Sequence, residues 1–167
     1  VVPKPFTRED ALRLIDIDKI EFTIPATFTS IADGEYANGV FTPFKSLQTV
    51  IIPKSIKYIG VRSFQGCSAL KNINLPDSIT SIEWIAFGDC RSLSSITFPD
   101  SVTQIAGYAF LNCASLKSIT ISDAALNNPN YGMYDDYYRD PFKGCTELIA
   151  ISQTLNMDVK EYLHHLN

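Results

Sequence analysis

The sequence has no long apolar run and no excess of basic residues. Its 167 residues include 14 Lys and Arg against 18 Asp and Glu, which gives a net charge of -4 at pH 7. A membrane-spanning helix needs about 18 or more consecutive apolar residues, and proteins that bind nucleic acids usually carry a basic stripe. We therefore expect neither membrane insertion nor a nucleic-acid partner.

Motifs of catalysis and metal binding are also missing. There is no Cys-x-x-Cys, no glycine-rich phosphate loop and no Gly-x-Ser-x-Gly. The only histidines, His164 and His165, are adjacent in an expected helix over 158–166, where neighbouring side chains point in different directions. The acidic stretches at 33–35 and 135–136 lack the alternating oxygen ligands of a calcium loop. We predict a protein that is not an enzyme and uses no cofactor or metal.

The composition is that of a folded domain. Apolar residues make up 46% of the chain and charged residues 19%, which argues against disorder. The length suits one domain better than two. The chain begins Val1-Val2-Pro3 without an initiator methionine, so we expect any targeting segment to be cleaved or to lie outside this sequence.

A repeat of 23 residues occupies the middle of the chain. Three full copies begin at Leu47, Leu70 and Leu93, and a fourth begins at Leu116. They share the pattern L-x-x-(V/I)-x-(I/L/F)-P-x-S-(I/V)-x-x-I-x-x-x-(S/A)-F-x-x-C-x-x. Such agreement indicates one structural unit that is stacked repeatedly.

Imperfect copies flank the full ones, as expected where terminal repeats seal the core. Residues 20–31 reproduce the first half of the pattern, and Phe41, Phe44 and Leu47 recover the register after an insertion. Downstream, Phe142 and Cys145 recover it after a longer insertion at about 127–140. We expect about five repeats.

The repeat predicts a solenoid of short parallel strands. The alternation Leu-x-x-Ile-x-Ile sends apolar side chains to one side of a strand, and the regular return places each strand beside its predecessor. The following proline ends the strand, because proline lacks the N–H that a ladder needs. The Ser-Ile-x-x-Ile segment predicts a short return strand. The turn after it carries a phenylalanine that fills the interior: Phe64, Phe87, Phe110 and Phe142.

This repeat resembles the 23-residue leucine-rich-repeat class of BspA-like surface proteins over roughly residues 20 to 150. In one copy the resemblance is carried by Leu70, Ile73, Leu75, Pro76, Ile79, Ile82, Ala86, Phe87 and Cys90. It implies a curved leucine-rich-repeat solenoid that acts in adhesion or other protein–protein contact, often on the surface of bacteria or protist parasites, and it implies no catalytic residues. The chain departs from the pattern in its long insertion and in Ser122, which replaces the proline.

The four cysteines follow the repeat. The gaps between Cys67, Cys90, Cys113 and Cys145 are 23, 23 and 32 residues, the last being one repeat plus the insertion. Phe44 takes the equivalent place in the first repeat, where it could replace neither a disulfide partner nor a metal ligand. We therefore expect a column of small buried side chains, in keeping with the preference of free cysteine for interiors.

Two surfaces of the solenoid are candidates for contact with a partner. The outward positions of the first strand are rich in hydroxyl and amide groups: Gln48, Lys71, Ser94 and Lys117; Thr49, Asn72, Ser95 and Ser118; Ile51, Asn74, Thr97 and Thr120. They either solvate a sheet face or bind a protein or glycan by hydrogen bonds. On the return segment, large residues are expected to point outward. Arg62, Trp84 and Tyr108 form what we call the return-turn ridge, and Val61 and Ile85 are also expected to face outward beside them. Trp, Tyr and Arg are frequent interface anchors, although stacking of Trp84 on Tyr108 would also account for the ridge.

The long insertion is a third candidate. It holds four of the eight tyrosines, namely Tyr131, Tyr134, Tyr137 and Tyr138. Tyrosine supplies contact area at low entropic cost, and insertions in repeat proteins often lie on the binding side. The segment either contacts a partner or folds back and caps the last coil.

The two ends predict short helical caps. We expect an N-terminal helical cap at 1–19, leucine-rich repeats at 20–151 and a C-terminal helical cap at 152–167. Thr7 is placed to cap a helix whose first turn carries Glu9 and Asp10. Such caps would cover the open edges of the sheets.

The sequence favours a non-enzymatic interaction or adhesion module that binds a protein or glycoprotein partner. The alternative is a structural subunit that occupies a fixed place in a larger multiprotein assembly, with the return-turn ridge permanently buried. The resemblance favours an extracellular or cell-surface location, whereas the alternative implies an intracellular or organellar assembly.

Overall fold

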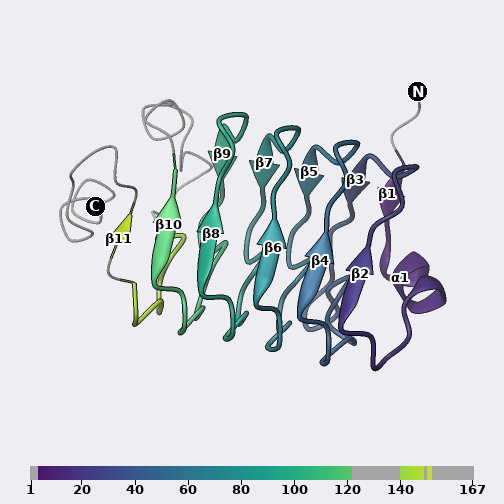
Figure 1. Cartoon of the computed structure of the whole chain (residues 1–167), viewed down its shortest axis with the longest axis horizontal. Helices are drawn as coiled ribbons and strands as arrows, with labels where there is room; N and C mark the ends of the chain where they lie inside the picture. Colours follow the sequence, from purple (N-terminus) through teal and green to yellow (C-terminus); the bar gives the residue numbers. More distant parts are fainter. Residues whose placement is uncertain (1–3, 122–139, 149, 152–167) are drawn as a thin grey trace.

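The computed structural model describes residues 4–121, 140–148, 150 and 151. Over these residues the chain forms a solenoid, in which strands from successive coils lie side by side in two rows (Figure 1). The predicted solenoid of parallel strands is confirmed. The tyrosine-rich insertion and the expected C-terminal helix lie outside the described residues.

The first strand of each coil belongs to the front row in Figure 1. These strands pair in parallel as two sheets, β2-β4-β6 and β8-β10-β11. Their bounds are β2 Glu21–Thr23, β4 Thr49–Ile51, β6 Asn72–Asn74, β8 Ser95–Thr97, β10 Ser118–Thr120 and β11 Ala150–Ile151. Strands β6 and β8 are neighbours in space without being paired (Figure 1). The apolar residue at the centre of the strand points inward, as Val50 and Ile96 do, whereas the flanking polar residues face solvent.

The return strands form one continuous five-stranded parallel sheet, in the order β1-β3-β5-β7-β9. Their bounds are β1 Pro5–Phe6, β3 Ser30–Ile31, β5 Tyr58–Ile59, β7 Ser81–Ile82 and β9 Gln104–Ile105. The second residue of each strand is buried, and the pairing places Ile31 beside Ile59 and Ile59 beside Ile82. The short return strand predicted from Ser-Ile-x-x-Ile is confirmed.

Two residues of the repeat pattern shape the corner between the strands. The carbonyl of the proline accepts a hydrogen bond from the residue three positions later, as Pro76 does from the Ile79 N–H at 3.0 Å. The serine that follows it ties neighbouring coils together. The Ser78 hydroxyl donates to the Ile56 carbonyl, and the Ser101 hydroxyl donates to the Ile79 carbonyl, both at 2.7 Å. Each bond satisfies a carbonyl of the preceding coil, whereas the hydroxyl of Ser55, at the same position one coil earlier, is buried without a hydrogen-bond partner among the described residues.

A column of stacked phenylalanine rings fills the interior. Ring centroids are 4.9 Å apart between Phe64 and Phe87 and 5.1 Å apart between Phe87 and Phe110, with the planes within 9° of parallel. The predicted Phe column is confirmed. It extends further toward the N-terminus than the repeat pattern indicated, because Phe41 stacks on Phe64 at 4.4 Å and Phe6 stacks on Phe41 at 5.6 Å. Each such pair contributes about 0.5–1.5 kcal/mol beyond its buried area.

The N-terminal edge is covered by helix α1 (Arg8–Leu14), as Figure 1 shows. Thr7 is its N-cap, as predicted, and forms a capping box in which the Asp10 N–H donates to the Thr7 hydroxyl and the Thr7 N–H donates to the Asp10 carboxylate. Burial works to raise the pKa of Asp10, but the hydrogen bonds from Thr7 and the charges of Arg13 and Lys4 outweigh it and lower the pKa.

The cysteines form the predicted column. Cys67, Cys90 and Cys113 are buried, Cys145 is half-buried, and all four are free thiols. The thiol of each of the last three donates to a phenylalanine carbonyl of the preceding coil, as Cys113 does to Phe87 at 3.1 Å. Burial raises the pKa of the Cys67 thiol to about 12. The thiols therefore act as packing and hydrogen-bonding groups of the core.

Candidate protein-binding surface

The return-turn ridge is built on an unusual backbone conformation. Arg62, Ile85 and Tyr108 occupy the same position in successive coils and have φ values of 53°, 55° and 60°. This left-handed conformation is uncommon for residues other than glycine. Because all three coils share it, the conformation belongs to the turn rather than to one side chain. Hydrogen bonds between coils fix the turn, as the Arg62 N–H donates to the Trp84 carbonyl at 3.0 Å.

Arg62 contacts two aromatic rings. Its guanidinium carbon is 4.3 Å from the centroid of the Trp84 ring and 5.4 Å from that of the Tyr36 ring. Arg62 and Trp84 are half-buried, whereas the Tyr36 side chain is 79% exposed. We call these three residues the Arg62 stack. Such cation–π contacts orient the guanidinium group and strengthen when water is excluded.

The carboxylates near the Arg62 stack have other partners. One Asp33 oxygen accepts hydrogen bonds from the Tyr58 hydroxyl at 3.0 Å and from the Val61 N–H at 2.8 Å. Burial and this hydrogen bond raise the pKa of Tyr58. Burial also raises the pKa of Glu83, and the charge of Asp33 adds to the rise. None of the ion pairs within the described part of the chain involves Arg62.

The rest of the ridge differs in part from the prediction. Tyr108 is half-buried, and the Lys143 ammonium nitrogen lies 5.5 Å from the centroid of its ring. The prediction that Ile85 points outward is wrong, because this side chain is only 7% exposed. Gly88 explains the difference: a Cβ atom at that position would collide with Ile85 Cγ2, so the glycine leaves the space that Ile85 fills.

Sequence reasoning missed Tyr36, the most exposed member of the Arg62 stack. Tyr36 lies in the insertion between the first and second coils, where the repeat pattern assigns no position. The signal that could have found it is the length of that insertion, which brings an aromatic residue to the level of the return turn. The predicted contact residues Tyr131, Tyr134, Tyr137 and Tyr138 lie outside the described residues.

The outward face of the first strands is polar, as predicted. Asn74, Thr97 and Thr120 are exposed at equivalent positions of β6, β8 and β10, whereas Ile51 is an exposed apolar residue on β4. The Lys117 ammonium nitrogen lies 3.4 Å from a carboxylate oxygen of Glu147, and both side chains are exposed. Exposed pairs of this kind contribute little to stability.

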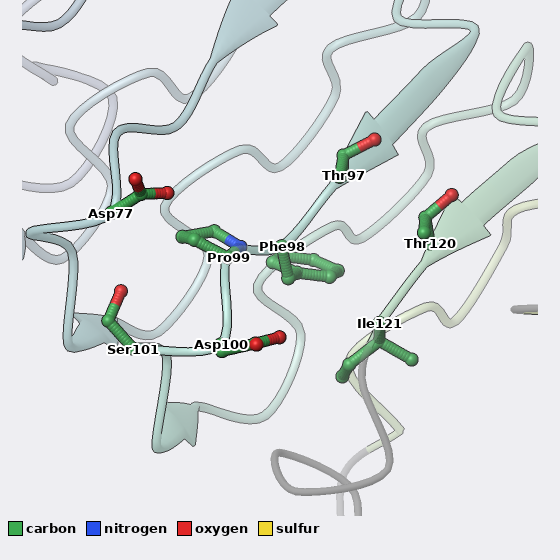
Figure 2. A pocket seen from close by; sticks show the side chains of 8 residues that line it. All are labelled: Asp77, Thr97, Phe98, Pro99, Asp100, Ser101, Thr120 and Ile121. Carbon is green, nitrogen blue, oxygen red and sulfur yellow. The ribbon is translucent and has the colours of Figure 1, made fainter. Parts of the chain in front are cut away.

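A hollow of about 660 Å³ lies where β8 and β10 end. Figure 2 shows Thr97 and Thr120 on one side of it, Asp77 and Ser101 on the other, and Phe98 between them. Its lining is completed by Pro99, Asp100 and Ile121. The hollow therefore combines an apolar floor with a rim of hydroxyl and carboxylate groups, and it contains no basic side chain among these lining residues.

Comparison of the sequence with known families decides the family. The profile described as "BspA type Leucine rich repeat region (6 copies)" matches residues 34–136, which is more than half of the chain. The chain belongs to the BspA-type leucine-rich-repeat family. The resemblance seen in the 23-residue repeat is confirmed, and no curated protein matches this BspA-type chain.

Solved structures of bacterial leucine-rich-repeat proteins share the fold of this BspA-type chain. A leucine rich cell surface protein of Faecalibacterium prausnitzii is 28% identical, with a TM-score of 0.66 over 81% of this chain and 32% of that one. A leucine-rich repeat protein of Bacteroides ovatus is 26% identical, with a TM-score of 0.61 over 78% of this chain and 36% of that one. The pneumococcal vaccine antigen PcpA is 20% identical, with a TM-score of 0.63 over 87% of this chain and 34% of that one. At this identity the likeness shows the fold alone. The chain spans about a third of the length of these proteins.

The described residues form neither a membrane-spanning helix nor a cluster of metal ligands. Within them, no helix has both the length and the apolar character of a membrane span. The same residues contain no group of three or more His, Cys, Asp or Glu side chains arranged to hold a metal ion.

Proposed function

We propose that this chain is a non-enzymatic protein-binding module and that its partner contacts the Arg62 stack. The observation that carries the proposal is the guanidinium group of Arg62, which contacts the rings of both Trp84 and Tyr36 on a half-exposed turn. Arg, Trp and Tyr are the residues that most often supply the binding energy of interfaces. Stacked repeats, moreover, are scaffolds whose extended surfaces serve recognition.

The contact extends, in this proposal, from the Arg62 stack to Tyr108 and to the tyrosines of the insertion. Tyr108 is half-buried and occupies, two coils further along, the turn position that Arg62 occupies. The insertion joins β10 to the coil that contains Phe142, whose ring stacks on Phe110. Tyr131, Tyr134, Tyr137 and Tyr138 are included because of their number and chemistry in the sequence.

We also propose that the module works at the cell surface, where it binds a protein or glycoprotein in adhesion. The support is the similar F. prausnitzii protein, which is described as a cell surface protein. Because the chain spans about a third of that protein, the module would be one part of a larger surface protein.

The test begins with size-exclusion chromatography and light scattering on the purified chain. Affinity capture from solubilised surface proteins follows, with wild type and a Trp84→Ser, Tyr134→Ser, Tyr138→Ser variant. Each captured protein is identified, produced separately and measured again against both chains. A monomeric wild type that binds, and a folded variant that does not, supports the binding module. If instead the wild type aggregates and the variant is monomeric, the result supports the alternative function, a structural subunit of a fixed assembly.

A further inference from the structure

We propose that the Arg62 stack is a binding site for one carboxylate group, an Asp or Glu side chain that stands beside an apolar residue on the partner. The inference rests on the proposed function for its biological setting. The recognition of a carboxylate can nevertheless be measured with the chain alone.

The guanidinium group of Arg62 has no ion-pair partner in the described part of the chain. Within the same residues, its Nε atom is buried without a hydrogen-bond partner. A buried donor that is left unpaired carries the full penalty of its lost hydration. The buried Nε is closed to a ligand, so a partner would pair with the terminal nitrogens of the guanidinium group, which are not among the buried unpaired atoms. A carboxylate is the acceptor that matches this edge of an arginine.

The acidic side chains near Arg62 do not pair with it. Asp33 uses the same carboxylate oxygen for Tyr58 and Val61, at 3.0 and 2.8 Å. The pKa of Glu83 is raised by burial and by Asp33, with no contribution from Arg62. The charged group of Arg62 is therefore available to pair with an acceptor on a partner.

Two aromatic rings contact the guanidinium group of Arg62. Its central carbon lies 4.3 Å from the centroid of the Trp84 ring and 5.4 Å from that of the Tyr36 ring, and these contacts restrict its orientation. The edge that carries the N–H donors is then the direction from which a planar carboxylate can pair with two hydrogen bonds. A lysine at this position would keep the charge but lose the planar fork.

The charges around Arg62 determine how many acidic residues the partner can present to it. Asp33, Glu35 and Glu83 lie in the segments around the stack, so this turn carries three carboxylates against one guanidinium group. A run of acidic residues would be repelled, because like charges brought together cost binding energy. An isolated carboxylate next to an apolar side chain satisfies Arg62 and also covers the exposed ring of Tyr36.

The experiment is a titration followed by NMR at the Arg62 Nε–H and Trp84 indole N–H resonances. The probes are the blocked peptides Ac-Gly-Glu-Leu-Gly-NH2, its Gln counterpart and Ac-Gly-Glu-Glu-Glu-Gly-NH2. Both resonances are expected to shift with the first peptide. Its Kd should be about tenfold lower than that of the Gln peptide, as the loss of one charge-assisted hydrogen bond predicts, and also lower than that of the tri-Glu peptide, which the neighbouring carboxylates repel. Arg62→Lys and Arg62→Gln should each weaken binding of the first peptide, with unchanged circular dichroism.

Arg91→Gln is the matched control, because Arg91 is exposed and already lies 3.4 Å from Asp89. It should leave the Kd within about twofold, a change well under 1 kcal/mol. Equal shifts with the Glu and Gln peptides, or equal binding by Arg62→Gln and wild type, would overturn the carboxylate site. If these probes fail while Trp84→Ser still loses a captured protein, only this inference is wrong and the proposed function stands.

Discussion

Replacement of Phe87 by leucine tests the stacked core. Phe87 is fully buried between two parallel rings, with centroids 4.9 Å away in Phe64 and 5.1 Å away in Phe110. Leucine keeps most of the volume but removes both ring pairs. At about 0.5–1.5 kcal/mol for each pair, the free energy of unfolding should fall by about 1–3 kcal/mol, plus a repacking cost of under about 1.5 kcal/mol.

Phe98→Leu is the matched control. Phe98 is also buried but has one ring partner among the described residues, Phe110, at 5.6 Å in an edge-on arrangement. Its ring contribution should therefore be about half as large. Urea unfolding, followed by circular dichroism and by Trp84 fluorescence, measures both variants. The double variant Phe64→Leu, Phe87→Leu should show a coupling of about 0.5–1.5 kcal/mol. Equal losses for Phe87→Leu and Phe98→Leu, with no coupling, would refute the stacking argument.

Four further predictions concern the core thiols, the helix cap and the turn. The Cys67 thiol should resist alkylation in the native chain at pH 8, as followed by mass spectrometry, because it is buried and its pKa is raised to about 12; rapid labelling would contradict its burial. Thr7→Ala should cost about 0.5–2 kcal/mol in urea unfolding through loss of the helix cap. Because folding lowers the pKa of Asp10, its stabilising effect is present above its ordinary pKa of 3.8 and is lost as the pH falls through the lower folded value. Wild type and Asp10→Asn should thus differ in thermal stability at neutral pH and converge in acid, and a constant difference would be evidence against this linkage. Gly88→Ala should destabilise by about 1–3 kcal/mol, because its Cβ would displace the buried Ile85; an unchanged melting temperature would show that this space is not filled.

Much of the fold could be predicted because the repeat imposes one environment on each position. Leu70 and Leu93 are buried at the same place in successive coils, as are Cys90 and Cys113. A position that stays apolar or small through several coils has to face the shared interior. Buried side chains therefore recur along the chain with the same 23-residue period as the sequence pattern.

The features that sequence reasoning missed are those that depart from the period. Phe6 lies in a two-residue strand that precedes the first recognisable repeat, so no pattern marked it as part of the ring column. Tyr36 reaches Arg62 from an insertion. Ile85 turns inward because one nearby residue, Gly88, is small. Each depends on a contact between side chains that the register of the repeat does not encode.

The central claim is that a protein partner binds at the Arg62 stack. The measurement that tests it most directly is the Kd of the identified partner for wild type, Trp84→Ser and Thr97→Ala, the last being a control on the polar strand face. We predict that Trp84→Ser weakens binding at least about tenfold, as expected of an interface anchor, while Thr97→Ala binds like wild type. Unchanged binding by Trp84→Ser together with weakened binding by Thr97→Ala would contradict the claim and would assign recognition to the strand face.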